Sequence, residues 1–180
     1  MKSSFLSVRD MTKLALCVAF CCVTAYISFP LPFTPGMVTA LTIALGVTAF
    51  VSTPKQTFLA LVTYVLLGSI GLPVFVGGTA GFGRLLGPTG GFIIAWLIVY
   101  PLVSALKGNV PNFRRYALVD ILVGIPLTYI GGMISMVLVM DITIGQAFVM
   151  AALPYIPGDV IKCIAAAFLG CKVNTVLQRD

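Results

Sequence analysis

Long apolar runs with almost no charge constrain this chain more than any other feature. Of its 180 residues, 59% are hydrophobic and only 9% are charged. Soluble domains carry about 25% charged residues, so this sequence cannot cover a water-facing surface. A helix of roughly 20 apolar residues spans a bilayer. The sequence therefore predicts an integral membrane protein.

The breaks between the apolar runs divide the chain into spans. We predict an all-α protein in which residues 1–180 form a single domain of six transmembrane helices. The predicted spans are residues 14–29, 37–51, 56–70, 90–106, 117–140 and 158–177. Proline lacks an amide donor and disfavours helix at the residue before it. Pro126 is therefore expected to kink the fifth span, and Pro154 and Pro157 to separate a short surface helix at 144–153 from the last one.

The basic residues are distributed unevenly between the two sides that these spans define. Cytoplasmic loops carry excess Lys and Arg. One side collects nine basic residues: Lys2, Arg9, Lys13, Lys55, Lys107, Arg114, Arg115, Lys172 and Arg179. The other side keeps Arg84 and Lys162. We therefore predict a multi-pass protein of a bacterial-type cell membrane with both termini in the cytoplasm and residues 71–91 forming an outer loop between the third and fourth helices.

Several function classes are excluded by composition. The chain has no histidine, so it lacks Ser-His and Cys-His pairs and an HExxH metal site, and it has no GxxxxGK[ST] phosphate loop. Its five cysteines form no CxxC pair, and Cys17, Cys21 and Cys22, which lie within an apolar helix, are expected to act as small apolar residues. The scattered basic residues do not suggest nucleic acid. We expect no enzyme activity, no metal and no cofactor.

The outer loop "GLPVFVGGTAGFGRLLGPTGG" is a candidate ligand-binding segment. Its glycines, Gly78 among them, allow close backbone approach to a ligand. Arg84 can hold a carboxylate through two hydrogen bonds. The alternative is a flexible turn, but long loops in compact domains tend to be functional.

Two charges open the last span, in "PGDVIK". Asp159 and Lys162 are three residues apart and lie on one helix face. Near the helix N-terminus an acidic side chain is favoured. The pair is either a salt bridge that stabilises the helix end or the polar corner of an apolar pocket.

Two further features lie towards the cytoplasmic side. Ala15 and Ala19 in "ALCVA" are one turn apart, a spacing that allows another helix to approach closely, although chance alanines in an apolar helix are the alternative. Asp120 is expected to be an N-terminal charge of the fifth helix or a partner of Arg114 or Arg115.

The sequence closely resembles the BioY family, the biotin-specific substrate-binding components of energy-coupling-factor (ECF) transporters. The resemblance rests on "FPLPFTPG", "STPK", the Gly-rich loop with GPTGG, and PGDxxK, and it covers nearly the whole chain. Family members have six helices, bind biotin from the outer side and join a coupling module of one transmembrane protein and two ATPases. The resemblance thus implies high-affinity biotin capture for uptake.

The family pattern also implies roles for particular residues. Asp159 and Lys162 match the PGDxxK pattern, which implies that they contact biotin. Ala15 and Ala19 match the AxxxA pattern with which the wider group of substrate-binding components docks the coupling module. The chain departs from the family at Ile43, where a glutamine is common, and at Phe92, where a tyrosine is. Thr39 or Thr42 is a candidate to replace the missing polar contact.

We expect Asp159 to accept from the urea N–H groups of biotin and Lys162 to donate to the urea carbonyl or neutralise Asp159. Phe75, Tyr155 and Trp96 are expected to contact the ring and tail, and Arg84 or loop amides the carboxylate; the roles of Arg84 and Lys162 could be exchanged. The rival hypotheses are a component for another vitamin such as thiamine or riboflavin, a non-transport assembly subunit, and an intramembrane enzyme that uses Asp159 and Lys162 as an acid-base pair.

Overall fold

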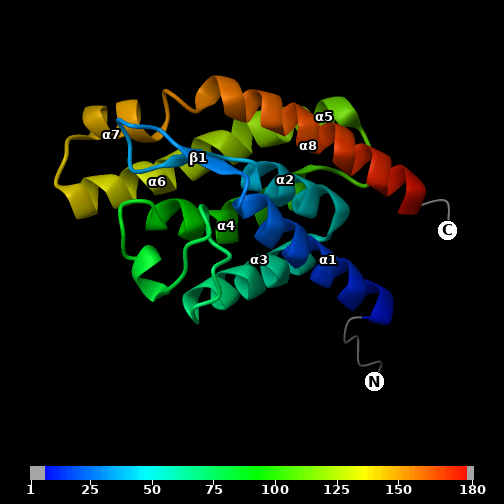
Figure 1. Cartoon of the computed structure of the whole chain (residues 1–180). Helices are drawn as coiled ribbons and strands as arrows, with labels where there is room; N and C mark the ends of the chain where they lie inside the picture. The colour runs from blue at the N-terminus through cyan, green and yellow to red at the C-terminus, as the bar shows by residue number, and fades with distance from the viewer. Residues whose placement is uncertain (1–6, 178–180) are drawn as a thin grey trace.

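The computed structural model describes residues 7–177 and is mostly helical (Figure 1). Lys2 and Arg179, two of the basic residues counted above, and the ends of the predicted domain lie outside the described residues. The helices are α1 (Val8–Ala25), α2 (Leu41–Val51), α3 (Pro54–Ser69), α4 (Gly90–Leu106), α5 (Phe113–Val119), α6 (Ile125–Met140), α7 (Ile144–Ala151) and α8 (Ile156–Leu177). A π-helical segment, η2 (Asp120–Gly124), joins α5 to α6 into one continuous helix.

Local sequence signals explain most helix boundaries. The Thr53 side chain accepts from the Gln56 amide while the Gln56 side chain accepts from the Thr53 amide, and Pro54 occupies the first turn of α3. Thr143 and Gln146 form the same reciprocal pair at the start of α7. The short helix predicted at 144–153 is therefore present, and the predicted fourth span coincides with α4.

The irregularity expected at Pro126 takes the form of η2, immediately before the proline. Proline has no amide N–H and its ring crowds the carbonyl four residues earlier. In η2 the Ile125 amide donates to the Asp120 carbonyl, five residues back. This wider turn lets the helix pass the proline without ending.

A two-stranded hairpin corrects the prediction that the first span extends to residue 29 and the second begins at residue 37. Strand β1 (Ser28–Pro30) pairs antiparallel with β2 (Met37–Thr39), and α1 ends at Ala25. Pro30 and Pro35 disfavour helix across this connection, and the strand pairing satisfies backbone groups that a helix would otherwise satisfy.

The helices differ in their capacity to cross a bilayer. Among the described residues, two helices have the length and apolar character to do so, Phe113–Met140 and Ile156–Leu177. Leu41–Val51 and Gly90–Leu106 are also apolar but shorter. Large apolar side chains stand exposed on the outside of the bundle, including Leu66, Ile98, Leu122, Leu138 and Phe168. Such a surface suits lipid rather than water.

The two ends of the bundle differ in character. The start of α1 and the end of α8 lie at one end, whereas the hairpin, the connection from α3 to α4, and α7 lie at the other (Figure 1). At the first end, carbonyls at the end of α2 accept hydrogen bonds from neighbouring helices: the Phe50 carbonyl from Asn174 Nδ2 (2.8 Å) and the Ser52 carbonyl from Ser104 Oγ (2.6 Å). Lys107 Nζ donates to both carbonyls as well. These hydrogen bonds tie α4 and α8 to the end of α2.

Candidate functional site

A pocket lies at the other end, between the hairpin, the Gly-rich connection and the helices α2, α4, α6 and α8. Its walls combine a few polar side chains with many apolar ones, as ligand sites do. The lining residues are Pro35, Gly36, Met37, Thr39, Thr42, Tyr64, Phe75, Val76, Thr79, Arg84, Thr89, Phe92, Ile93, Trp96, Thr128, Tyr129, Tyr155, Asp159 and Lys162. The predicted residues Asp159, Lys162, Arg84, Phe75, Tyr155 and Trp96 thus meet in one cavity.

Asp159 lies at the centre of the polar corner of this pocket. It sits in the first turn of α8, where the helix dipole favours an acidic group. Lys162 Nζ is 2.7 Å from Asp159 Oδ1, and the Tyr129 hydroxyl donates to Asp159 Oδ2 at 2.7 Å. Each carboxylate oxygen therefore has one donor within the protein and retains capacity to accept another.

Tyr129 is a site residue that the sequence reasoning missed. It comes from α6, 30 residues before Asp159. A tyrosine within an apolar helix carries no sequence signal of which way its hydroxyl points. Only the packing of α6 beside the start of α8 brings the two groups together.

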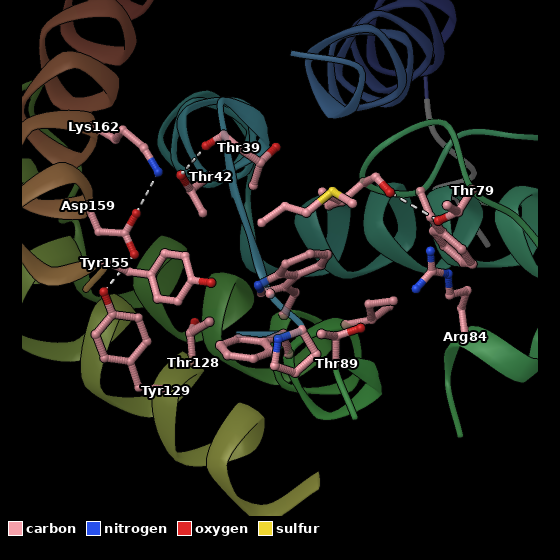
Figure 2. A pocket seen from close by; sticks show the side chains of 18 of the residues that line it. Thr39, Thr42, Thr79, Arg84, Thr89, Thr128, Tyr129, Tyr155, Asp159 and Lys162 are labelled. Carbon is pink, nitrogen blue, oxygen red and sulfur yellow. Dashed lines mark hydrogen bonds and ion pairs between the residues drawn. The ribbon is translucent and has the colours of Figure 1, made fainter. Parts of the chain in front are cut away.

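Arg84 occupies the opposite side of the pocket from Asp159. Figure 2 shows Asp159, Lys162, Tyr129, Tyr155 and Thr128 gathered on one side, and Arg84 with Thr79 on the other. Arg84 ends the 3₁₀ turn η1 (Phe82–Arg84). The ion pairs of the described residues are Lys13–Asp10 and Lys162–Asp159, so Arg84 is in neither. Its guanidinium is available to an anionic group.

The apolar wall between these two ends depends on aromatic packing. Phe75 is only 2% exposed, and its ring meets Tyr64 edge-on with centroids 5.9 Å apart. Gly68 makes room for that ring, since a Cβ at this position would overlap it. The Tyr64 hydroxyl donates to the Val74 carbonyl at 2.9 Å and so fixes the connection next to Phe75.

Two polar atoms in the pocket wall have no hydrogen-bond partner in the protein. They are Trp96 Nε1 and Thr128 Oγ1, both buried. Buried polar atoms are nearly always hydrogen-bonded. Because both residues line the pocket, a ligand is the natural partner. Thr128 was not identified from the sequence, since an isolated threonine in an apolar helix usually bonds to its own backbone.

The remaining predicted residues have different positions. Thr39 and Thr42 line the pocket, whereas Ile43 does not. Gly78 is also not among the lining residues: it has a positive φ of 68°, and a Cβ there would lie 3.0 Å from the Tyr26 ring. Its glycine character serves the turn, and its expected contact with a ligand stays a prediction.

Two residues predicted outside the pocket also have clear positions. Ala15 and Ala19 are exposed on α1. Asp120 is 1% exposed and belongs to neither ion pair given above, so its expected pairing with Arg114 or Arg115 is wrong. The π-helical segment turns its side chain into the bundle.

Known proteins with similar sequence and structure include several transporters. The chain is 34% identical to a probable biotin transporter BioY of Bacillus subtilis, covering 96% of this chain and 94% of the relative. It is 32% identical to the biotin transporter BioY2 of Lactococcus lactis, covering 94% and 92%. A crystal structure of the S-component for biotin from an ECF-type ABC transporter superposes with a TM-score of 0.86 at 26% identity, covering 93% of this chain and 92% of that one. The BioY family matches residues 1–179, and the chain therefore belongs to the BioY family.

Proposed function

We propose that this protein captures biotin at the outer face of the membrane and delivers it for uptake as the substrate-binding component of an ECF-type transporter. The observation that carries the proposal is the separation of two polar ends in one apolar pocket, Asp159 with its donors at one end and Arg84 at the other. Biotin has the matching chemistry, a cyclic urea at one end, a carboxylate at the other, and an apolar thioether ring and chain between them.

The urea belongs at the Asp159 end. A carboxylate accepts N–H donors strongly, and charge-assisted hydrogen bonds are roughly twice as strong as neutral ones. Asp159 already accepts hydrogen bonds from Lys162 and Tyr129, and these orient the carboxylate towards the urea N–H groups. Lys162 or the Thr128 hydroxyl then donates to the urea carbonyl.

The ligand carboxylate belongs at Arg84. Lys162 could compete for this role, but its ammonium lies 2.7 Å from Asp159 and is neutralised there. Arg84 carries no such partner and its planar guanidinium matches a carboxylate. Phe75, Trp96 and Tyr155 contact the apolar ring and chain between the two ends.

We infer the membrane arrangement from the different character of the two ends of the bundle. We place six spans in a bacterial-type cell membrane at α1, α2, α3, α4, α5–α6 and α8, with both termini in the cytoplasm. Lys13, Lys55, Lys107, Arg114 and Arg115 then lie on the cytoplasmic side, which agrees with the excess of positive charge expected there. The Gly-rich connection from α3 to α4 and the pocket face outward.

Transport requires an energy source in partner subunits, which we propose are a transmembrane coupling protein and two ATPases. Ala15 and Ala19 present small side chains on the exposed face of α1, away from the pocket. Small residues one turn apart let a second helix approach closely. We assign this face to the coupling protein.

Calorimetric titration of the purified chain with biotin, thiamine and riboflavin tests the ligand. We expect one-to-one binding of biotin alone, and Asp159→Asn should weaken it at least about tenfold because the charged acceptor is lost. Binding of thiamine or riboflavin in its place would assign the chain to another vitamin. Absence of heat with all three would favour an assembly subunit, and a chemically altered product would favour an enzyme.

A further inference from the structure

A second acidic side chain lies inside the bundle, outside the pocket. Asp120, the first residue of η2, is 1% exposed. Its Oδ1 atom has no hydrogen-bond partner. The residue does not line the pocket, and the ligand proposal above leaves it without a role.

The surroundings of this carboxyl are shaped to hold it. A Cβ on Gly124 would overlap Asp120 Oδ1, and a Cβ on Gly46 would lie 2.9 Å from Oδ2. Gly124 is on the same helix, whereas Gly46 is on α2. The π-helical turn and the two glycines together form a close-fitting site for one carboxyl group between α2, η2 and α8, and π-helical turns often occur at functional sites.

Within the part of the chain that the structure describes, no cation forms an ion pair with Asp120. The ion pairs of residues 7–177 are Lys13–Asp10 and Lys162–Asp159. The titratable groups that face Asp120 are Cys163 and Asp159 from α8 and Tyr100 from α4, and α2 contributes none. Cys163 offers a weak thiol donor, Tyr100 is an uncharged phenol and Asp159 is a second negative group, so none of the three supplies a cation.

An ionised carboxylate buried without a cation or sufficient hydrogen bonds is very unfavourable. The group avoids this by keeping its proton. We propose that Asp120 is a proton-binding site, a neutral carboxylic acid locked between α2 and α8 in the packed protein. The proton stays bound while these helices stay together, and a conformation that parts them and admits water releases it.

This inference does not depend on which ligand fills the pocket, and its test uses ligand-free protein. The chain has only five acidic side chains, all aspartates, so infrared spectra of protein with isotope-labelled aspartate carboxyls contain few bands. At neutral pH we expect one band of a neutral carboxylic acid in the full chain. That band should disappear in Asp120→Asn and remain in the matched control Asp159→Asn.

Two outcomes would overturn the proposal. One is a spectrum of the unaltered protein that contains carboxylate bands alone. The other is a neutral-acid band that survives Asp120→Asn. If that variant does not fold, Gly124→Ala serves instead, because its methyl group presses on Oδ1 and must shift the band; an unshifted band would equally exclude Asp120.

Discussion

The Tyr129 hydroxyl donates to Asp159 Oδ2 at 2.7 Å, while Lys162 holds the other oxygen of the same carboxylate. One side chain from α6 and one from α8 therefore define the direction in which Asp159 faces the pocket. A carboxylate held from both sides loses little freedom when a ligand arrives, which favours tight binding.

Replacing Tyr129 by Phe tests this arrangement. Hydrogen bonds to charged groups contribute about 1.5–3 kcal/mol, so biotin affinity should fall roughly tenfold with little change in fold. Calorimetric titration measures the change. Tyr116→Phe is the control, since Tyr116 is also buried but lies outside the pocket and should leave affinity unchanged. Equal affinities in the two variants would remove Tyr129 from the site.

Replacing Arg84 by Met tests the end of the pocket assigned to the ligand carboxylate. Loss of a charge-assisted pair should weaken biotin about tenfold. Biotin methyl ester carries no carboxylate charge and should bind the variant and the unaltered protein alike. Arg114→Met, at the far end of the bundle, serves as the control. A parallel loss for acid and ester would mean that Arg84 shapes the loop rather than binding the anion.

Thr128→Val should separate affinity from stability. The change removes the hydroxyl and nearly preserves the shape of the side chain. An unpaired buried hydroxyl destabilises the empty protein, so the thermal stability without ligand should stay the same or rise. Biotin affinity should fall about fivefold if the hydroxyl bonds the ligand. Unchanged affinity would show that Thr128 has no ligand contact.

Gly68→Ala should damage the apolar wall. The added methyl group overlaps the Phe75 ring, and forcing such an overlap costs about 1–3 kcal/mol. Thermal unfolding in detergent should show the loss, and biotin affinity should fall with it. Gly145→Ala is the matched control because no atom lies within 4 Å of its Cβ position. If both variants were equally stable, Phe75 would not require Gly68.

Ala19→Trp should abolish biotin uptake in cells that contain the coupling module but leave binding by the purified chain intact. Ala19 is exposed, so a large side chain there disturbs only a partner helix. Phe20→Trp, at an exposed position about 100° around α1 from Ala19, replaces one large aromatic side chain with another and is the control. Normal uptake in the Ala19 variant would rule out the docking assignment.

Much of the helical order could be predicted from the sequence because its signals are local. The start of the last helix was placed within two residues, since Pro154 and Pro157 admit few alternatives. The pairing of Asp159 with Lys162 followed from helix geometry alone. The Gly-rich connection pointed to the pocket through its length and its single arginine.

The missed features depend on contacts between distant segments. Tyr129 and Thr128 belong to the site only because α6 packs beside the entry to α8. The burial of Asp120 depends on one wider helical turn before Pro126, which changes the direction of the side chain. The hairpin depends on strand pairing between Ser28 and Thr39, which proline positions alone do not specify.

The two polar ends of the pocket stand on separate parts of the chain, Arg84 on the connection from α3 to α4 and Asp159 on α8. A ligand long enough to contact both Arg84 and Asp159 would hold the connection against α8. An analogue with a shorter tail would occupy the Asp159 end of the pocket but would not reach Arg84, so the connection would keep its freedom to move. Occupancy of the pocket and protection of the connection against protease can then be measured separately. A short-tailed analogue should give the first without the second, whereas a ligand that reaches Arg84 should give both.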